Sequence, residues 1–133
     1  MKHLLILSIF CVVSCSPTLP IYDLKISGNA IQAPVSGFED SFFNILRDQN
    51  APFDILLVKE SQLAYHALYL KCPFDEKALD TTPSQIVCPV CASVFDFDGV
   101  VKRGPASGPL STFPTELNPD ATLVRINIES LGR

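Results

Sequence analysis

Two apolar runs in the middle of the chain most constrain what it can fold into. Phe53–Lys59 and Leu63–Lys71 are joined by the short polar segment Glu60-Ser61-Gln62. Apolar runs of this length with a short polar connection are typical of a β-hairpin. Both runs are apolar on both faces, so we expect the hairpin to lie centrally in a sheet that is covered on both sides.

Further short strands are predicted on either side of this hairpin. They show either alternation of apolar and polar residues or an adjacent Asp-Gly turn signal. These strands are Tyr22–Ile26, Val94–Asp96, Val100–Lys102 and Thr122–Ile128. Gly-Asn and Ala-Pro breakers predict a loop at Ser27–Gly37, whereas Ser41–Arg47 fits a strand or a helix equally. Many short strands, 11 prolines and no convincing long amphipathic helix predict a single all-β domain.

Three cysteines after the central hairpin are the candidate ligands of a metal centre. They are Cys72, in Cys72-Pro73-Phe74, and Cys88 and Cys91, in Cys88-Pro89-Val90-Cys91. Thiolates bind both zinc and the irons of iron–sulfur clusters. The cysteines therefore direct the search for function to these two segments.

The residues that follow these cysteines resemble the cluster-binding half of a Rieske [2Fe–2S] domain. Phe95-Asp96 and Gly99 match the Phe-Asp-x-x-Gly pattern of that family, and Gly104-Pro105-Ala106 with Pro109-Leu110 matches its Gly-Pro-Ala-x-x-Pro-Leu loop. The resemblance covers about residues 53 to 128. It implies an antiparallel β sandwich or barrel with a small inserted cluster-binding subdomain at about residues 70–111.

The resemblance also implies roles for single residues. Cys72 and Cys88 stand at the two thiolate positions of the family. Ser93 stands where the family has a serine that can hydrogen-bond to cluster sulfide. Gly104, Pro105 and Ala106 would belong to the loop that covers the cluster.

The chain departs from the family at both histidine ligands, which normally hold the second iron. Phe74 and Cys91 occupy their positions. Asp75 is a candidate fourth ligand, although a lone carboxylate in a polar stretch is more often a solvated loop residue. His66 is predicted to lie on the strand that leads to Cys72, about 20 Å away along it, and so to be outside the site.

The sequence leaves four states of the three thiols open. A [2Fe–2S] cluster could use the three thiolates with Asp75 or water. Zinc could replace it, but a structural zinc site takes four protein ligands, and Cys88-x-x-Cys91 is the one knuckle that we predict. A disulfide between Cys72 and Cys88 would contribute about 3 kcal/mol in the chain-entropy model. A reactive Cys88–Cys91 redox pair is disfavoured because the motif is predicted in a β loop.

The first residues resemble the signal of a bacterial lipoprotein. The apolar run Leu4–Val13 would rise only about 15 Å as a helix, against roughly 30 Å for a hydrocarbon core. Val12-Val13-Ser14-Cys15 resembles a lipobox. The resemblance implies that residues 1–14 are a signal peptide removed by cleavage and that Cys15 carries the lipid.

The predicted anchor has consequences for organisation and location. Residues 15–20 contain two prolines and would form a short stiff tether, and residues 21–133 would form the Rieske-like domain. We expect a lipid-anchored protein of the bacterial cell envelope. Ser16, rather than an aspartate, follows the lipidated cysteine, which favours the outer over the inner membrane.

Two functions are consistent with these patterns. The first is a membrane-anchored one-electron carrier with a variant [2Fe–2S] site. The second is a cluster-free Rieske-fold lipoprotein, held together by a disulfide or zinc, with a binding or structural role. No Ser/His/Asp arrangement, phosphate loop or carboxylate pair indicates an enzyme by itself. A net charge of −4 without a basic cluster argues against nucleic acid, so the expected partners are the membrane and an envelope redox or binding partner.

Overall fold

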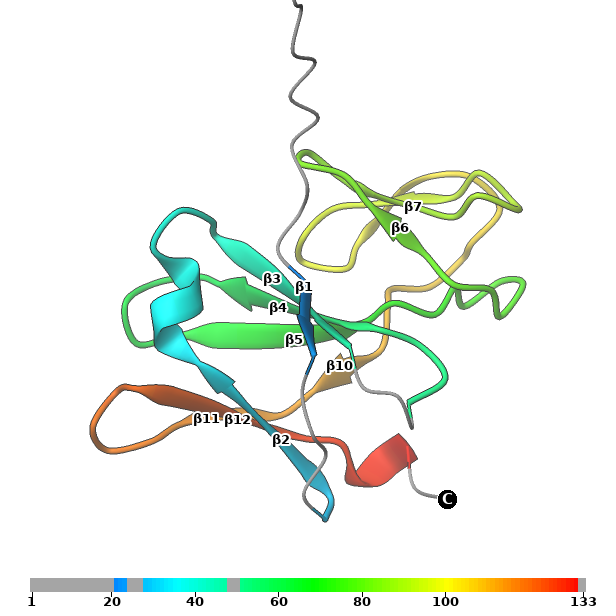
Figure 1. Ribbon diagram of the computed structural model, residues 1–133. Coiled ribbons are helices and arrows are strands. Elements are labelled where there is room, and N and C mark those ends of the chain that lie inside the picture. Colours follow the sequence, from blue (N-terminus) through cyan, green and yellow to red (C-terminus); the bar gives the residue numbers. More distant parts are fainter. Residues whose placement is uncertain (1–20, 24–27, 48–50, 132–133) are drawn as a thin grey trace, which may run out of the picture.

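A computed structural model describes residues 21–23, 28–47 and 51–131 of the chain (Figure 1). Within these ranges the regular structure is all-β, apart from two short 3-10 turns, η1 (Val35–Phe38) and η2 (Glu129–Leu131). None of the helical turns in this part of the chain is long or apolar enough to cross a membrane. The predicted signal peptide, Cys15, the tether and most of the strand predicted at Tyr22–Ile26 lie outside the described residues.

The largest sheet has five strands and is built around the predicted central hairpin. In spatial order they are β1 (Ile21–Asp23), β3 (Phe43–Arg47), β4 (Ile55–Lys59), β5 (Tyr65–Tyr69) and β10 (Thr112–Phe113). Neighbouring strands are antiparallel except for β1 and β3, which are parallel. The hairpin β4–β5 is confirmed, and the ambiguous segment Ser41–Arg47 contains a strand.

A three-stranded sheet contains one strand that the local sequence did not predict. Its order is β11 (Thr115–Leu117), β12 (Leu123–Asn127) and β2 (Ala30–Pro34). The prediction of a loop throughout Ser27–Gly37 was wrong, because β2 pairs antiparallel with β12 from Ala30↔Asn127 to Pro34↔Leu123. Pairing between segments so far apart in the chain overrides the local turn signals.

A four-stranded sheet lies in the chain between β5 and β10. Its order is β6 (Asp80–Thr81), β7 (Ile86–Val87), β8 (Val94–Phe95) and β9 (Val101–Arg103). Figure 1 shows it beside the five-stranded sheet, at the upper right. We call this sheet with its connections, residues 71–110, the insert.

The predicted turn between β8 and β9 is confirmed, and its geometry explains the Phe-Asp-x-x-Gly pattern. The Asp96 carboxylate accepts the backbone N–H groups of Asp98 and Val100, at 3.0 and 2.9 Å. Its other oxygen lies 2.7 Å from Nζ of Lys102. Gly99 has φ +80°, and an added Cβ would lie 3.0 Å from Leu68 Cδ2, so glycine suits both the backbone and the space.

Two hydrophobic cores lie on opposite faces of the hairpin β4–β5. The first is shared with the three-stranded sheet and includes Ile31, Leu57, Ala67, Val124 and Ile126. The second is shared with the insert and includes Leu56, Leu68, Cys72, Ile86, Cys88 and Phe95. Successive residues of a strand point to opposite faces, so Leu56 and Leu57 enter different cores. The hairpin is covered on both sides as predicted, and two of the three thiols belong to the second core.

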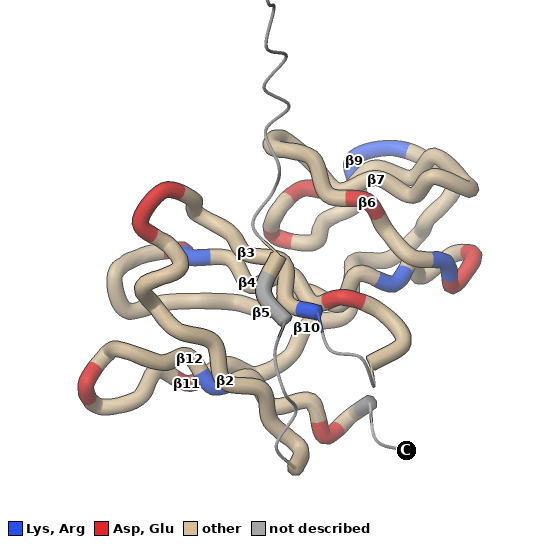
Figure 2. Tube along the Cα trace, in the orientation of Figure 1, with Lys and Arg blue, Asp and Glu red and all other residues tan. Residues whose placement is uncertain are grey.

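The turn of the insert at Phe97 rests on the five-stranded sheet. The Phe97 ring stacks on Phe43 of β3, with 5.0 Å between centroids. Nε2 of His66, on β5, lies 2.6 Å from the Phe97 carbonyl oxygen, and its Nδ1 lies 2.7 Å from a carboxylate oxygen of Glu60. His66 therefore joins sheet to insert and lies outside the thiol group, as predicted. Figure 2 shows the Lys and Arg residues scattered along the described trace.

Candidate metal centre

Two turns of the insert share one backbone hydrogen-bond pattern, and we call them the first and second knuckle. In the first knuckle, Cys72–Lys77, the Cys72 N–H donates to the Lys77 carbonyl at 2.8 Å, and the Glu76 N–H donates to the Cys72 carbonyl at 3.0 Å. In the second knuckle, Cys88–Ser93, the Cys88 N–H donates to Ser93 at 2.8 Å, and the Ala92 N–H donates to Cys88 at 3.0 Å. The two turns therefore make the same two backbone hydrogen bonds at corresponding positions.

The backbone dihedrals and the sequences repeat in the same register. The fifth residue of each knuckle has a left-handed backbone, with φ 60° at Glu76 and 61° at Ala92. Each knuckle begins Cys-Pro, as Cys72-Pro73-Phe74-Asp75 and Cys88-Pro89-Val90-Cys91. Asp75 therefore occupies the position that Cys91 has in the second knuckle.

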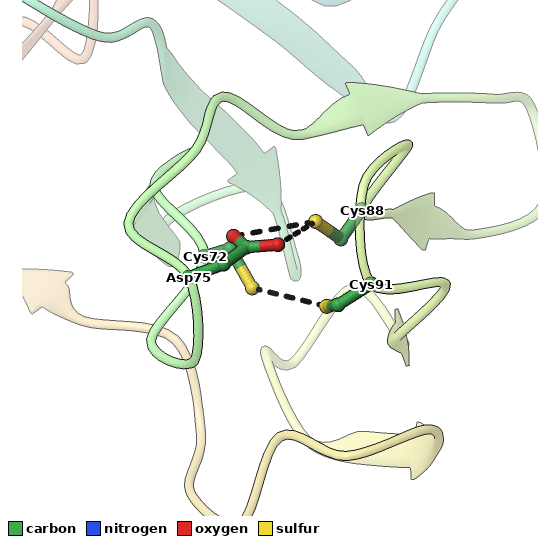
Figure 3. Close-up of side chains that lie close together, drawn as sticks. All are labelled: Cys72, Asp75, Cys88 and Cys91. Carbon is green, nitrogen blue, oxygen red and sulfur yellow. Dashed lines mark hydrogen bonds between the residues drawn. The ribbon is translucent and has the colours of Figure 1, made fainter.

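The knuckles bring three thiols and one carboxylate together. Figure 3 shows Cys72 and Asp75 on one side facing Cys88 and Cys91 on the other. The Sγ atoms of Cys72 and Cys91 are 3.7 Å apart, and the Cys88 thiol lies 3.3 and 3.5 Å from the two carboxylate oxygens of Asp75. One donor atom from each residue lies within 4.8 Å of all the others. Such a group could hold a metal ion.

The residues of the two knuckles differ widely in exposure. Cys72 and Cys88 are 0% exposed, whereas Asp75 and Cys91 are half-buried. The third residues of the knuckles, Phe74 and Val90, are 58% and 65% exposed. The Phe74 ring thus projects into solvent at the tip of the first knuckle, and the residue after it contributes the fourth donor atom.

Burial and hydrogen bonding set the proton affinity of the donors. Burial raises the pKa of Cys88 to about 12 and also raises the pKa of Cys72. Burial acts in the same direction on Asp75 and Cys91, but hydrogen bonds outweigh it, and both pKa values are lowered. The Lys77 N–H is the main hydrogen-bond cause at Asp75, and Ser93 is the main one at Cys91. Metal binding would therefore displace protons from the two buried thiols, and it should weaken as the pH falls.

The predicted covering loop lies against the second knuckle. The buried Ser93 Oγ accepts the Ala106 N–H at 3.1 Å and lies 3.1 Å from Cys91 Sγ. Gly104 has φ +99°, and an added Cβ would lie 2.5 Å from Ser93 Cα. Only glycine fits there, because any side chain would collide with the knuckle backbone. Pro105, between these contacts, is exposed.

The structure adds two features that the sequence did not predict. Cys72–Lys77 repeats the backbone turn of the one predicted Cys-x-x-Cys knuckle. The half-buried Asp75 carboxylate, the candidate fourth ligand, faces the thiols. A signal was present in the shared pattern Cys-Pro-x-Asp and Cys-Pro-x-Cys. It was weak because the left-handed positions carry Glu76 and Ala92 in place of glycine. All three described cysteines are free thiols.

The fold and the site define an all-β protein with a three-thiol, one-carboxylate group that could hold a metal ion. No protein-family model matches the chain, and no curated protein matches it. The Rieske assignment therefore stays a prediction from the motifs.

Proposed function

We propose that this protein binds one zinc ion through Cys72, Asp75, Cys88 and Cys91. Zn–S bonds of about 2.3 Å in a tetrahedral site separate two thiolates by about 3.8 Å, and a thiolate from a carboxylate oxygen by about 3.5 Å. The structure has 3.7 Å between Cys72 and Cys91, and 3.3 and 3.5 Å between Cys88 and Asp75. The agreement at these two donor pairs, in a group whose four donor atoms all lie within 4.8 Å of one another, is the observation that carries the proposal.

The compactness of the site gives less support to a [2Fe–2S] cluster. Such a cluster has two irons joined by sulfides, and each iron takes two outer ligands. The outer ligands of different irons are farther apart than ligands of a single ion, because the cluster core lies between them. Four donors within 4.8 Å of one another favour one ion.

The proposed role of the ion is to tie the two knuckles together. The strands of the insert are only two or three residues long, and two of the donor thiols are part of its hydrophobic core. A structural zinc site has four protein ligands, which this group supplies. We thus favour the cluster-free Rieske-like lipoprotein, anchored through Cys15 in the cell envelope and acting in binding or as a structural component. The lipobox resemblance supports the anchor.

Metal analysis of the full chain, purified in detergent, tests this proposal. We expect one zinc per chain and no acid-labile sulfide. Asp75→Ala should lower the zinc content after dialysis, whereas Asp80→Ala, which removes an exposed carboxylate of the insert outside both knuckles, should leave it unchanged. Two irons with sulfide in each chain, or metal-free protein with a disulfide, would overturn the proposal.

A second candidate is a one-electron carrier with a single iron in the same site. Its support is the partial exposure of Asp75 and Cys91, which would put an ion near the surface. Thiolate-rich tetrahedral sites accept iron as well as zinc. Iron-loaded protein should then show a visible absorption band that disappears reversibly on reduction, and a band that does not respond to reductant would exclude this candidate.

A further inference from the structure

The candidate site has a closed side and an open side. Cys72 and Cys88 are 0% exposed and pack in the second core with Leu79 and Ile86. Asp75 and Cys91 are half-buried. An ion bound between them would be covered by the core on one side and reachable from solvent on the other, so exchange must begin at Asp75 or Cys91.

The structure supports Cys91 more firmly than Asp75. Cys91 is backed by the fully buried Ser93, whose Oγ lies 3.1 Å from Cys91 Sγ and is held by the Ala106 N–H. Thiolate is also a softer ligand than carboxylate and binds zinc or iron more strongly in a mixed set. The second knuckle therefore retains its donor when the site opens.

Asp75 has a hydrogen-bond partner besides the thiols. Its Oδ1 accepts the backbone N–H of Lys77 at 3.1 Å, and the residues around it, Phe74, Glu76 and Lys77, are exposed. A carboxylate that leaves the ion therefore keeps a hydrogen bond and is stabilised by water. The free-energy cost of releasing this carboxylate from the ion is lower than that of releasing a buried thiolate.

We propose that Asp75 is the ligand through which the metal ion enters and leaves, which makes the centre an exchangeable site. This inference rests on the proposed function, since it presumes an ion bound by the four residues. In the exchange step the bond from the ion to the Asp75 carboxylate breaks while a bond to an incoming donor forms, with no change of oxidation state. The incoming ligand would be a nitrogen- or sulfur-donor chelator that approaches between the knuckle tips.

Zinc release to an excess of the chelating dye 4-(2-pyridylazo)resorcinol tests the inference. The zinc-loaded full chain is compared anaerobically with Asp75→Cys, which makes both knuckles Cys-x-x-Cys. We expect release from Asp75→Cys to be slower by about tenfold or more, because even outer-shell changes alter metal affinity by that factor. Asp75→Ala should release zinc faster by a similar factor. Asp80→Ala, which removes an exposed carboxylate of the insert outside both knuckles, is the matched control and should behave as the unsubstituted chain.

A second readout identifies the ligand at position 75 directly. With Co²⁺ in place of zinc, Asp75→Cys should raise the thiolate-to-cobalt absorption by roughly a third, since four thiolates replace three. Equal release rates for the unsubstituted chain and both Asp75 variants would overturn the exchange role while leaving one zinc per chain in place. A full chain that binds no zinc would instead overturn the proposed function and this inference with it.

Discussion

The two knuckles of the insert have the same backbone and differ in what lies behind it. The second knuckle is backed by the covering loop, through Ser93, Gly104 and Ala106. The equivalent position to Ser93 in the first knuckle is the exposed Lys77. The second knuckle therefore presents two thiols on a supported turn, and the first presents a buried thiol and a half-buried carboxylate on a turn whose other residues are exposed. The comparison shows that the same backbone turn can be packed against a neighbouring loop or left without one, and it predicts a firm and a loose metal ligand at the two turns.

The largest expected effect comes from removing the proposed zinc ion, which would separate the knuckles. When free zinc is a thousand times its dissociation constant, bound zinc should raise the free energy of unfolding by about 4 kcal/mol. Chelation of the zinc, or Cys88→Ala, should remove this contribution. Denaturant unfolding with and without chelator measures this. Identical unfolding curves would show that the ion does not hold the knuckles together.

A smaller effect is expected from pushing the covering loop off the second knuckle. Gly104→Ala combines a left-handed backbone with a Cβ 2.5 Å from Ser93 Cα. Backbone strain at residue 104 and displacement of the covering loop should together lower the free energy of unfolding by about 3 kcal/mol. Gly108→Ala is the matched control, because an added Cβ there meets no atom within 4 Å. An equal loss of stability in the two variants, measured by denaturant unfolding, would contradict this account.

The support of each knuckle can be compared at its sixth residue. Ser93→Ala removes the acceptor of the buried Ala106 N–H and should cost about 2 kcal/mol. Lys77→Ala, at the equivalent exposed position, should change stability by less than about 0.5 kcal/mol. Thermal unfolding of both variants measures the difference. Equal effects would mean that the covering loop does not distinguish the knuckles.

The smallest expected effect comes from placing glycine at the left-handed position of each knuckle. This pair of substitutions tests whether the two backbones are equivalent. Ala92→Gly should stabilise by up to about 1 kcal/mol, because relief of the left-handed strain exceeds the entropy that glycine adds to the unfolded chain. Glu76→Gly should stabilise the protein slightly less than Ala92→Gly, since it also removes the surface ion pair with Lys71. Denaturant unfolding of both variants measures these gains. A loss of stability in only one of them would show that the knuckles differ in backbone.

The sequence predicted those parts of the fold that depend on neighbours in the chain. The hairpin β4–β5 and the turn at Asp98-Gly99 have local signals, and both are confirmed. Strand β2 was missed because its partner β12 lies about ninety residues further along the chain. The first knuckle was missed because Asp75 stands where the second knuckle has Cys91, so the Cys-x-x-Cys spacing that marks the second knuckle is absent from the first.

The sequence by itself determined the all-β class, the central hairpin, the Asp96 turn and the three candidate thiols. These follow from strand periodicity, from turn-forming residues and from the ligand chemistry of cysteine, which are all readable over a few residues. Tertiary structure alone decided which donors meet. Asp75 reaches Cys88, and Ser93 reaches Ala106, each across 13 residues, while Cys72 reaches Cys91 across 19. No local pattern encodes such contacts, because they arise only when the two knuckles and the covering loop of the insert fold together.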